Sequence, residues 1–484
     1  MTLAAVGRTS AVSDRAYELF IGGRWVGGSA RIEVRNPFDG QRIATIVAGR
    51  VDDAMAAIEA AERALAGEFP AHARYDLLMR AADLIEARQD DYAWAIACEG
   101  SKTIREARRE PPRAATIFRL AAEESRRLTG ETLPFDSRPG SERRVGYFVR
   151  VPVGIIVAIA PFNDPLAVAA HKVAPALAAG NAIVLKPASA TPLSSLLLAE
   201  DVATAGLPPG RLNVVTGRGE EIGSALAADP RVRMVTFTGG VATGERIARA
   251  AGIKKLSLEL GSNSPVIVLG DADLEMAVRS IVAGGFAQAG QNCLGVQRVF
   301  VHESLYPAFT TTFVAAVSAL TAGSSLDEST DVCSMISERE ASRLESWIRE
   351  AVAQGARVLV GGRREGALLW PTVLEGVPAG VKLDVDEAYG PVVSLYCVSS
   401  LEEGITRANE GSYGLHAAIF TASLGDAFAA SARLSVGAVM VNDSTDYRLD
   451  VMPFGGMKRS GIGREGVRFA TEAMTDTRVV CFNL

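Results

Sequence analysis

Residues 150–260 alternate short, continuously apolar runs with helical stretches, and this alternation limits the chain to few folds. The runs lie at residues 155–160, 182–185, 213–215 and 234–237. Strands without polar alternation are typical of a parallel sheet that helices cover on both faces. Four strand–helix units within about 100 residues predict a doubly wound, Rossmann-like α/β domain that binds a dinucleotide. We expect a second α/β unit beyond residue 293.

Charge and cysteine usage exclude several classes of protein. The 484-residue chain has a net charge of −6 and lacks the basic clusters typical of nucleic-acid binding. It has no secretory signal and no apolar run of membrane-spanning length, so we expect no membrane association. Its five cysteines and four histidines are scattered, which predicts no metal site and a reducing, cytoplasmic location. We expect residues 1 to about 17 to form a loose leader.

Cys293 lies in a polar turn, residues 290–293, between a predicted helix at residues 273–288 and a predicted strand at residues 296–301. A cysteine at such a junction has polar neighbours that can hold and present a thiolate. The alternative is a buried structural thiol, which is the more common state of a lone cysteine.

Glu259 favours the reactive thiol. It stands between two leucines, shortly before Gly261, near the end of a strand-like run, residues 255–260, where a carboxylate is costly unless paired or used. A cysteine nucleophile and a glutamate that activates water are what two-step acyl chemistry requires. The thiol attacks first, and water then hydrolyses the thioester.

At these residues the chain resembles the aldehyde dehydrogenase superfamily, and the resemblance extends from about Phe20 to the C-terminus. Further family motifs lie at residues 386–392, 409–415, 439–442 and 453–465. The chain is similar to the branch that oxidises lactaldehyde, glyceraldehyde 3-phosphate and phosphonoaldehydes. The resemblance implies a three-part aldehyde dehydrogenase fold. Its parts are a cofactor-binding domain (18–127 and 151–258), an α/β catalytic domain (259–442) and a small β oligomerisation element (128–150 and 466–484).

Residues 161–165 resemble the family's Pro-aromatic-Asn-x-Pro motif. The resemblance implies that the Asn163 side chain and the backbone N–H of Cys293 stabilise an oxyanion. Asp164 departs from the aromatic residue usual at its position and alters the pocket wall. Lys172 resembles a lysine proposed to assist proton movement, although a solvated helix lysine is the alternative.

Lys186 ends a buried strand, where open α/β sheets bind ligands. The resemblance implies that it holds the hydroxyls of the adenosine ribose. NAD-preferring members often carry glutamate where this chain has Ser189, and a serine does not repel a 2′-phosphate. We therefore expect the cofactor to be NAD or NADP, with no metal.

A strand-to-helix turn contains Gly239, Gly240 and Gly244, whose backbone N–H groups can meet a pyrophosphate. The spacing is not GxGxxG, so a simple tight turn is the alternative. The turn resembles the family's Phe-Thr-Gly-Ser turn, with Gly240 in place of the serine. By the same resemblance, Glu387 would hold the nicotinamide ribose and Tyr389 would flank the ring, unless they form an ordinary acidic turn.

Three residues are candidates for substrate binding. His171 falls about two helical turns beyond Asn163, and Arg448 precedes the motif at residues 453–465. Arg113, on an N-terminal helix, would complete a cationic rim. Phosphate-binding members often have arginine immediately before the nucleophile, where this chain has Asn292. Surface positions for both arginines are the alternative.

The resemblance implies oxidation of a small, polar or anionic aldehyde to its carboxylate, through a thiohemiacetal and a thioester on Cys293. It implies a homodimer or homotetramer, with the strands at residues 147–151 and 479–482 at subunit contacts. One alternative is a coenzyme-A-acylating relative, which discharges the thioester onto a thiol and needs no carboxylate like Glu259. The other is a catalytically silent homologue with a structural role.

Overall fold

The predicted strand–helix units form the middle of an eight-stranded sheet in the computed structural model, which describes residues 12–484. Five strands of this sheet run parallel: β8 (Ile155–Ile159), β9 (Ala182–Lys186), β10 (Leu212–Val214), β11 (Val232–Thr238) and β12 (Lys255–Glu259). They alternate with four helices: α6 (Ala167–Ala178), α7 (Leu193–Thr204), α8 (Gly219–Ala228) and α9 (Val241–Ala251). The prediction of a doubly wound α/β sheet is confirmed.

The strand order β12-β11-β8-β9-β10 creates a switch point in this sheet. The chain proceeds in one direction from β8 to β10 and in the other from β11 to β12, so the connections diverge between β8 and β11. Open α/β sheets bind ligands beyond the carboxyl ends of their strands at such a point. Asn163 follows β8, Gly239 follows β11 and Glu259 ends β12. The topology therefore gathers three predicted site residues at one edge.

Alternate residues of the central strands are buried on opposite faces of the sheet, as expected of a sheet that helices cover on both sides. Ile156 and Ala158 of β8 pack into a cluster with residues of α6 and α7. Ile155 and Val157 pack into another cluster on the α1 and α8 side. The N-terminal helices complete these layers: α1 (Val51–Leu65), α2 (Ala71–Ala87), α3 (Gln89–Glu99), α4 (Ile104–Ala107) and α5 (Glu110–Ser125).

Segments from both ends of the chain extend the sheet. On one side, β2 (Leu19–Ile21) pairs antiparallel with β10, and β3 (Arg24–Val26) follows it. On the other side, β22 (Gly461–Ile462) pairs antiparallel with β12. A separate small sheet contains β1 (Ala16–Tyr17), β5 (Arg42–Val47) and β4 (Arg31–Arg35).

The second α/β unit predicted beyond Cys293 is a seven-stranded sheet. In spatial order its strands are β15 (Arg357–Val360), β18 (Thr372–Glu375), β19 (Val392–Val398), β14 (Val296–His302), β13 (Ser264–Val268), β20 (His416–Phe420) and β21 (Ala438–Val441), and β15 alone is antiparallel to its neighbour. Its helices are α10 (Leu274–Phe286), α11 (Tyr306–Ser318), α12 (Glu338–Ala353), α13 (Lys382–Val385), α14 (Leu401–Asn409) and α15 (Leu424–Arg433). A two-stranded ribbon, β16 (Arg364–Glu365) and β17 (Leu368–Leu369), lies near α12.

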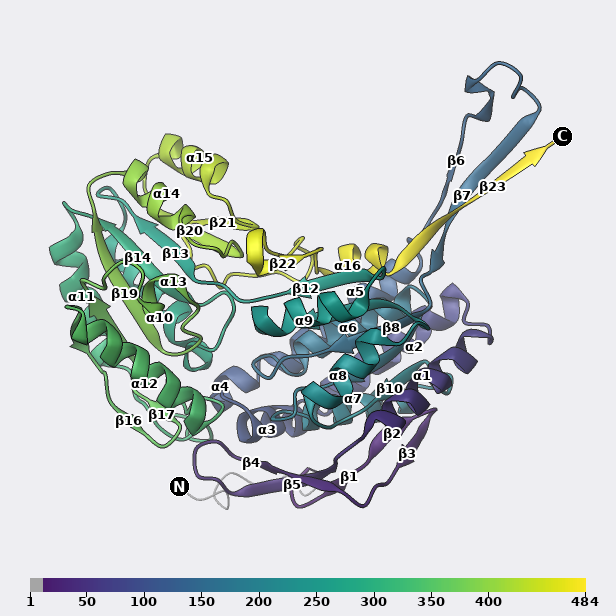
Figure 1. Ribbon diagram of the computed structural model, residues 1–484, viewed down its shortest axis with the longest axis horizontal. Coiled ribbons are helices and arrows are strands. Elements are labelled where there is room, and N and C mark those ends of the chain that lie inside the picture. The colour runs from purple at the N-terminus through teal and green to yellow at the C-terminus, as the bar shows by residue number, and fades with distance from the viewer. Residues whose placement is uncertain (1–11) are drawn as a thin grey trace.

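A long β arm projects away from both sheets, at the upper right of Figure 1. It contains β6 (Glu131–Thr132), β7 (Arg144–Pro152) and β23 (Thr475–Asn483), which follows α16 (Val467–Ala473). Strand β23 pairs with β7 along its whole length and leaves its other edge open. The two segments predicted to lie at subunit contacts, residues 147–151 and 479–482, therefore belong to two paired strands of the same arm.

No helix within residues 12–484 is long and apolar enough to cross a bilayer. Most of the predicted leader, residues 1–11, lies outside the described residues. Its end is not loose, because Val12 and Tyr17 are buried and Tyr17 belongs to β1.

Candidate active site

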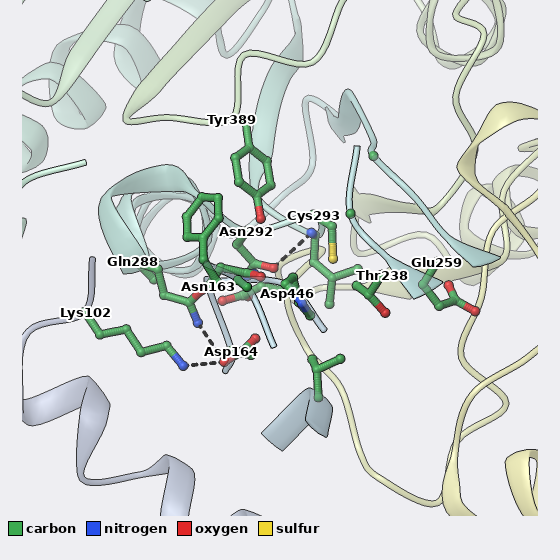
Figure 2. Close-up of a pocket in the computed structure, with 18 of the residues that line it drawn as sticks. Lys102, Asn163, Asp164, Thr238, Glu259, Gln288, Asn292, Cys293, Tyr389 and Asp446 are labelled. Atoms are coloured by element: carbon green, nitrogen blue, oxygen red, sulfur yellow. Dashed lines mark hydrogen bonds and ion pairs between the residues drawn. The ribbon is translucent and has the colours of Figure 1, made fainter. Parts of the chain in front are cut away.

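A cavity of about 600 Å³ lies at the carboxyl ends of the central strands and is closed by loops of the seven-stranded sheet. Asn163, Glu259 and Cys293 all line it (Figure 2). Residues far apart in the sequence thus surround a single space, next to the switch point of the sheet.

The loop that carries Cys293 has an unusual backbone. Gln288 and Ala289 adopt φ values of 55° and 53°, in the left-handed region that side chains disfavour. Gly290 follows with φ 66°, and a Cβ there would lie 2.2 Å from the carbonyl oxygen of Gly390. The buried Gln291 fastens the loop because its Oε1 accepts the N–H of Ile336 at 3.0 Å. These contacts hold the Cys293 loop in a conformation that costs free energy.

The Cys293 thiol is held neutral by its surroundings. Burial raises its pKa, the carboxyl of Glu387 raises it further, and the guanidinium of Arg448 lowers it. A thiol in this state must lose its proton before it can act as a nucleophile. Proton removal is therefore part of any reaction at this cysteine.

Asn163 is available to a ligand. It is buried immediately after β8, yet within residues 12–484 its side-chain amide makes no hydrogen bond. Buried amides are normally paired. An amide N–H that lines a cavity next to a nucleophile can donate to a developing oxyanion.

Glu259 is the most unusual carboxyl in the cavity. Its side chain is 1% exposed, and neither carboxyl oxygen has a hydrogen-bond partner among the described residues. Burial raises its pKa well above 4.5, and the nearby Glu465 raises it further. An unpaired buried carboxyl is costly, so a functional role offers the better explanation.

Lys172 lies behind the cavity rather than in its lining. Its Nζ donates to Thr236 Oγ1 and to Glu465 Oε1, each at 3.0 Å. The other oxygen of Glu465 accepts from Arg448 at 3.1 Å. Burial alone would raise the pKa of Glu465, but Lys172 and Arg448 outweigh it and hold this pKa well below its usual range. Glu465 is not among the predicted site residues, although it lies at the end of the family motif at residues 453–465.

The three candidate substrate residues are not equally placed. Arg113 and Arg448 line the cavity, whereas His171 is buried behind it and bonds Asp450 Oδ1 through Nε2 at 2.8 Å. Burial and Arg448 lower the pKa of His171 to about 4, so the ring is neutral and Nε2 carries the hydrogen. Arg113 pairs with the same carboxylate at 2.8 Å. Both arginines therefore already have carboxylate partners.

The two residues predicted to contact the adenosine end lie on the same edge of the sheet, outside the lining of this cavity. Lys186 is buried, and its Nζ donates to the carbonyl oxygen of Pro187 at 2.7 Å. Burial lowers its pKa to about 8. Ser189 is exposed, and its Oγ donates to the carbonyl oxygen of Gly217 at 2.8 Å.

The three glycines predicted for the β11–α9 turn do different things, and the prediction is wrong for Gly244, which lies inside α9 because the helix begins at Val241. The N–H of Gly239 donates to the carbonyl oxygen of Glu259 at 3.0 Å, so it is already used. Gly240 caps α9, and a Cβ there would meet no atom within 4 Å. At Gly244 a Cβ would lie 2.5 Å from a methyl carbon of Leu260, so that glycine serves packing. The open space at Gly240 and the N-terminus of α9 fit a phosphate group.

Glu387 and Tyr389 line the same cavity. Glu387 Oε1 accepts the N–H of Ser262 at 2.8 Å, and burial raises the pKa of this carboxyl to about 7. Gly261 permits this approach, because a Cβ there would lie 2.2 Å from Glu387 Oε2. Tyr389 has φ 48° and packs edge-on against Phe162 with ring centroids 5.8 Å apart.

A charged cluster forms one side of the cavity, and sequence reasoning found only part of it. Lys102 bridges Asp164 and Glu110. Figure 2 shows Lys102 and the side chain of Gln288 both reaching Asp164. In the sequence, Asp164 stands out as a departure from the family motif at residues 161–165. Glu110 and Gln288 look like ordinary helix and turn residues and so could not be selected. No group of three or more metal-ligating side chains is found between residues 12 and 484.

Comparison with known proteins agrees with this geometry. Residues 25–480 match the model of the family described as Aldehyde dehydrogenase family. The chain is 44% identical over 476 residues to the 3-sulfolactaldehyde dehydrogenase of Priestia aryabhattai, covering 98% of this chain and 100% of that one. It is 46% identical over 456 residues to aspartate-semialdehyde dehydrogenase 1 of Pseudomonas canavaninivorans, covering 94% and 97%.

A solved structure shares the whole fold. It is the NADP-dependent glyceraldehyde-3-phosphate dehydrogenase of Bacillus halodurans complexed with NADP, which superposes with a TM-score of 0.94 at 38% identity. The match covers 97% of this chain and 99% of that chain. The fold predicted by resemblance is therefore confirmed.

Proposed function

The chain belongs to the aldehyde dehydrogenase family, and on that premise we propose that it converts a small polar aldehyde to its carboxylate through a thioester on Cys293. It is an NAD(P)-dependent oxidoreductase. The observation that carries the mechanism is the buried, unpaired carboxyl of Glu259 in the same cavity as the thiol.

The residues present fit a dinucleotide cofactor. The buried ammonium of Lys186 and the open turn at Gly240 suit its adenosine and phosphate groups, and Glu387 suits a ribose hydroxyl. The exposed Ser189 carries no charge that would repel a 2′-phosphate, so use of both NAD and NADP is expected. When bound, the cofactor supplies the acceptor for the hydride that the aldehyde loses.

Cys293 first releases its thiol proton to water, and the resulting thiolate then attacks the carbonyl carbon of the aldehyde to form the anion of a thiohemiacetal. The free amide of Asn163 and the N–H of Cys293 stabilise the negative oxygen. Loss of the hydride leaves a thioester on Cys293. Lys172 is a candidate for assisting proton movement, and its Nζ donates a hydrogen bond to Glu465 behind the cavity.

Glu259 then removes a proton from water, which attacks the thioester and releases the carboxylate. A carboxyl with no partner in the protein has free lone pairs for such a water. This role argues against the coenzyme-A-acylating alternative, which needs no base for water. The presence of Cys293, Glu259 and Asn163 around one cavity argues against the silent homologue.

Two substitutions test the two steps separately. Cys293→Ala is expected to abolish NADH formation, because no thiohemiacetal can form. Glu259→Gln should still release about one NADH per active site and then stall, because hydride loss precedes hydrolysis. Rapid mixing with a simple aldehyde, with and without coenzyme A, measures both. If coenzyme A restores turnover to Glu259→Gln and accelerates the unmodified enzyme, the chain is an acylating enzyme.

The names of the relatives support a polar substrate, since they specify sulfolactaldehyde and aspartate semialdehyde for those proteins. An anionic group is also compatible with the cavity, where Arg109 is exposed and has no ion pair within residues 12–484. We further propose a cytoplasmic homodimer or homotetramer, which the open edge of the β arm supports.

A further inference from the structure

Asp164 presents an unused hydrogen-bond acceptor to the cavity. Its side chain is 18% exposed, and it directly follows Asn163 in the lining. Its Oδ1 accepts from Lys102 Nζ and, at 3.3 Å, from Gln288 Nε2. No hydrogen bond from residues 12–484 reaches its Oδ2. Half of this carboxylate is therefore fixed by the protein, and the other half is available to a substrate.

The fixed half rests on a rigid support. Lys102 is 5% exposed and shares its ammonium with Glu110 Oε2 at 2.7 Å. The other oxygen of Glu110 accepts the N–H groups of Leu166 and Ala167, each at 2.8 Å, at the start of α6. Each member of this chain of contacts is tied to the backbone or to a buried charge. The position of Asp164 is thereby preorganised rather than adjustable.

Asp164 remains ionised in this setting. Burial raises its pKa, but Lys102 and Arg113 outweigh this effect and hold the pKa below its usual range. Arg113 and Arg448 offer less to a substrate than an unpaired arginine of the cavity does, because Arg113 is paired with Asp450 and Arg448 with Glu465. This part of the wall therefore favours a hydrogen-bond donor over an anion.

We propose that Asp164 is a specificity residue that accepts a hydrogen bond from the substrate, so that preferred aldehydes carry a hydroxyl or ammonium group near the carbonyl. The inference rests on the proposed oxidation of aldehydes at Cys293. An aldehyde without a donor leaves the carboxylate desolvated and unpaired, which lowers its kcat/KM. Hydrogen bonds to charged groups predict a preference of about 10- to 100-fold.

Matched pairs of aldehydes test this preference. One arm compares 2-hydroxypropanal with propanal, and the other compares 3-aminopropanal with butanal, in each case as a ratio of kcat/KM. We expect a ratio of about 10 or more in at least one arm, and the arm identifies the donor as hydroxyl or ammonium. The ratio does not depend on the fraction of folded enzyme, because both aldehydes are measured on one preparation.

Two variants assign the preference to Asp164. Asp164→Asn preserves size but can turn its amide N–H groups toward the cavity, so the ratio should fall at least several-fold. Asp164→Leu removes the acceptor, leaves Lys102 paired with Glu110, and should reduce the ratio to near one. A ratio near one in the unmodified enzyme, or an unchanged ratio in both variants, overturns the inference while oxidation of propanal still supports the proposed function. Failure to oxidise any aldehyde overturns both.

Discussion

At the scale of single residues, two buried glutamates in one cavity have opposite properties. Glu465 is paired with Lys172 and Arg448, and its pKa is lowered. Glu259 has no hydrogen-bond partner among the described residues, and burial raises its pKa. The paired glutamate is a permanent anion, whereas the unpaired one can exchange a proton. This division suits Glu259 for general base catalysis.

The raised pKa of Glu259 predicts how hydrolysis depends on pH. The carboxyl acts as a base only when deprotonated, so steady-state kcat should rise with pH through a pKa above 4.5 and fall on acidification. The measurement is kcat against pH with saturating aldehyde and cofactor. Residual hydrolysis in Glu259→Gln should lack this ionisation. The same pH dependence in both proteins would assign it to another group, such as the Cys293 thiol.

Sequence reasoning selected Cys293, Glu259 and Asn163, which line one cavity, because each stands at the end of a recognisable strand or motif. The sequence contains no sign that His171 is buried outside the lining of the cavity. The partner of His171 is Asp450, which is distant in the sequence and follows no motif. Pairings of this kind arise only from the tertiary fold. The chemical roles of these residues stay predictions.

At the scale of elements, two helices of the sheet receive their N-terminal caps from elsewhere in the chain. Glu99, the last residue of α3, accepts the N–H of Leu193 at 2.8 Å at the start of α7. Glu110, the first residue of α5, does the same for α6. The first turn of a helix has N–H groups without partners, and a carboxylate also interacts favourably with the helix dipole. These glutamates connect the N-terminal helices to the central sheet.

Removal of the Glu110 cap should destabilise the protein substantially. Glu110→Ala leaves two N–H groups and part of a buried ammonium unsatisfied, which costs roughly 3–5 kcal/mol. Thermal unfolding followed by circular dichroism should show a clearly lower Tm. The control is Glu124→Ala on the same helix, which removes a pair with Arg127 near the surface and should cost about 1 kcal/mol or less. Equal effects of the two substitutions would argue against the capping role.

The strands of the central sheet could be predicted because their apolar runs are uninterrupted, as at residues 182–185. The connections that cap helices across elements could not, since a glutamate in a helical segment gives no local sign of its partner. The left-handed backbone at Gln288 and Ala289 could not be predicted either, because these residues are not glycines. The next two residues of the loop, Gly290 and Gln291, contact Gly390 and Ile336, which are distant in the sequence.

At the scale of the whole molecule, the β arm is the feature that most requires a partner. Val479 is 59% exposed and Phe482 is 48% exposed on β23, and the outer edge of this strand has no neighbour in the described chain. Such an edge is prone to pair with another strand. The apolar side chains and the free edge together support assembly through the arm.

Deletion of residues 478–484 should weaken assembly. The deletion removes most of β23 and the apolar side chains on it, so light scattering at micromolar concentration should show a smaller species than the full chain. A matched variant, Val479→Thr with Phe482→Ser, keeps the strand and tests the apolar contribution alone. A full chain that is monomeric under these conditions would contradict the proposed assembly.

The pairing of β22 with β12 has a consequence for how the enzyme is made. Glu259 lies opposite Gly461 in this pairing, and Leu260 donates its N–H to the carbonyl oxygen of Ser460 at 2.9 Å. The ribosome synthesises Glu259 and Cys293 long before residues 460–465 emerge. Glu259 and its surroundings therefore reach their final form only when translation is almost complete. A nascent chain would carry Cys293 without a finished cavity, and we expect incomplete chains to be inactive products rather than partially active enzymes.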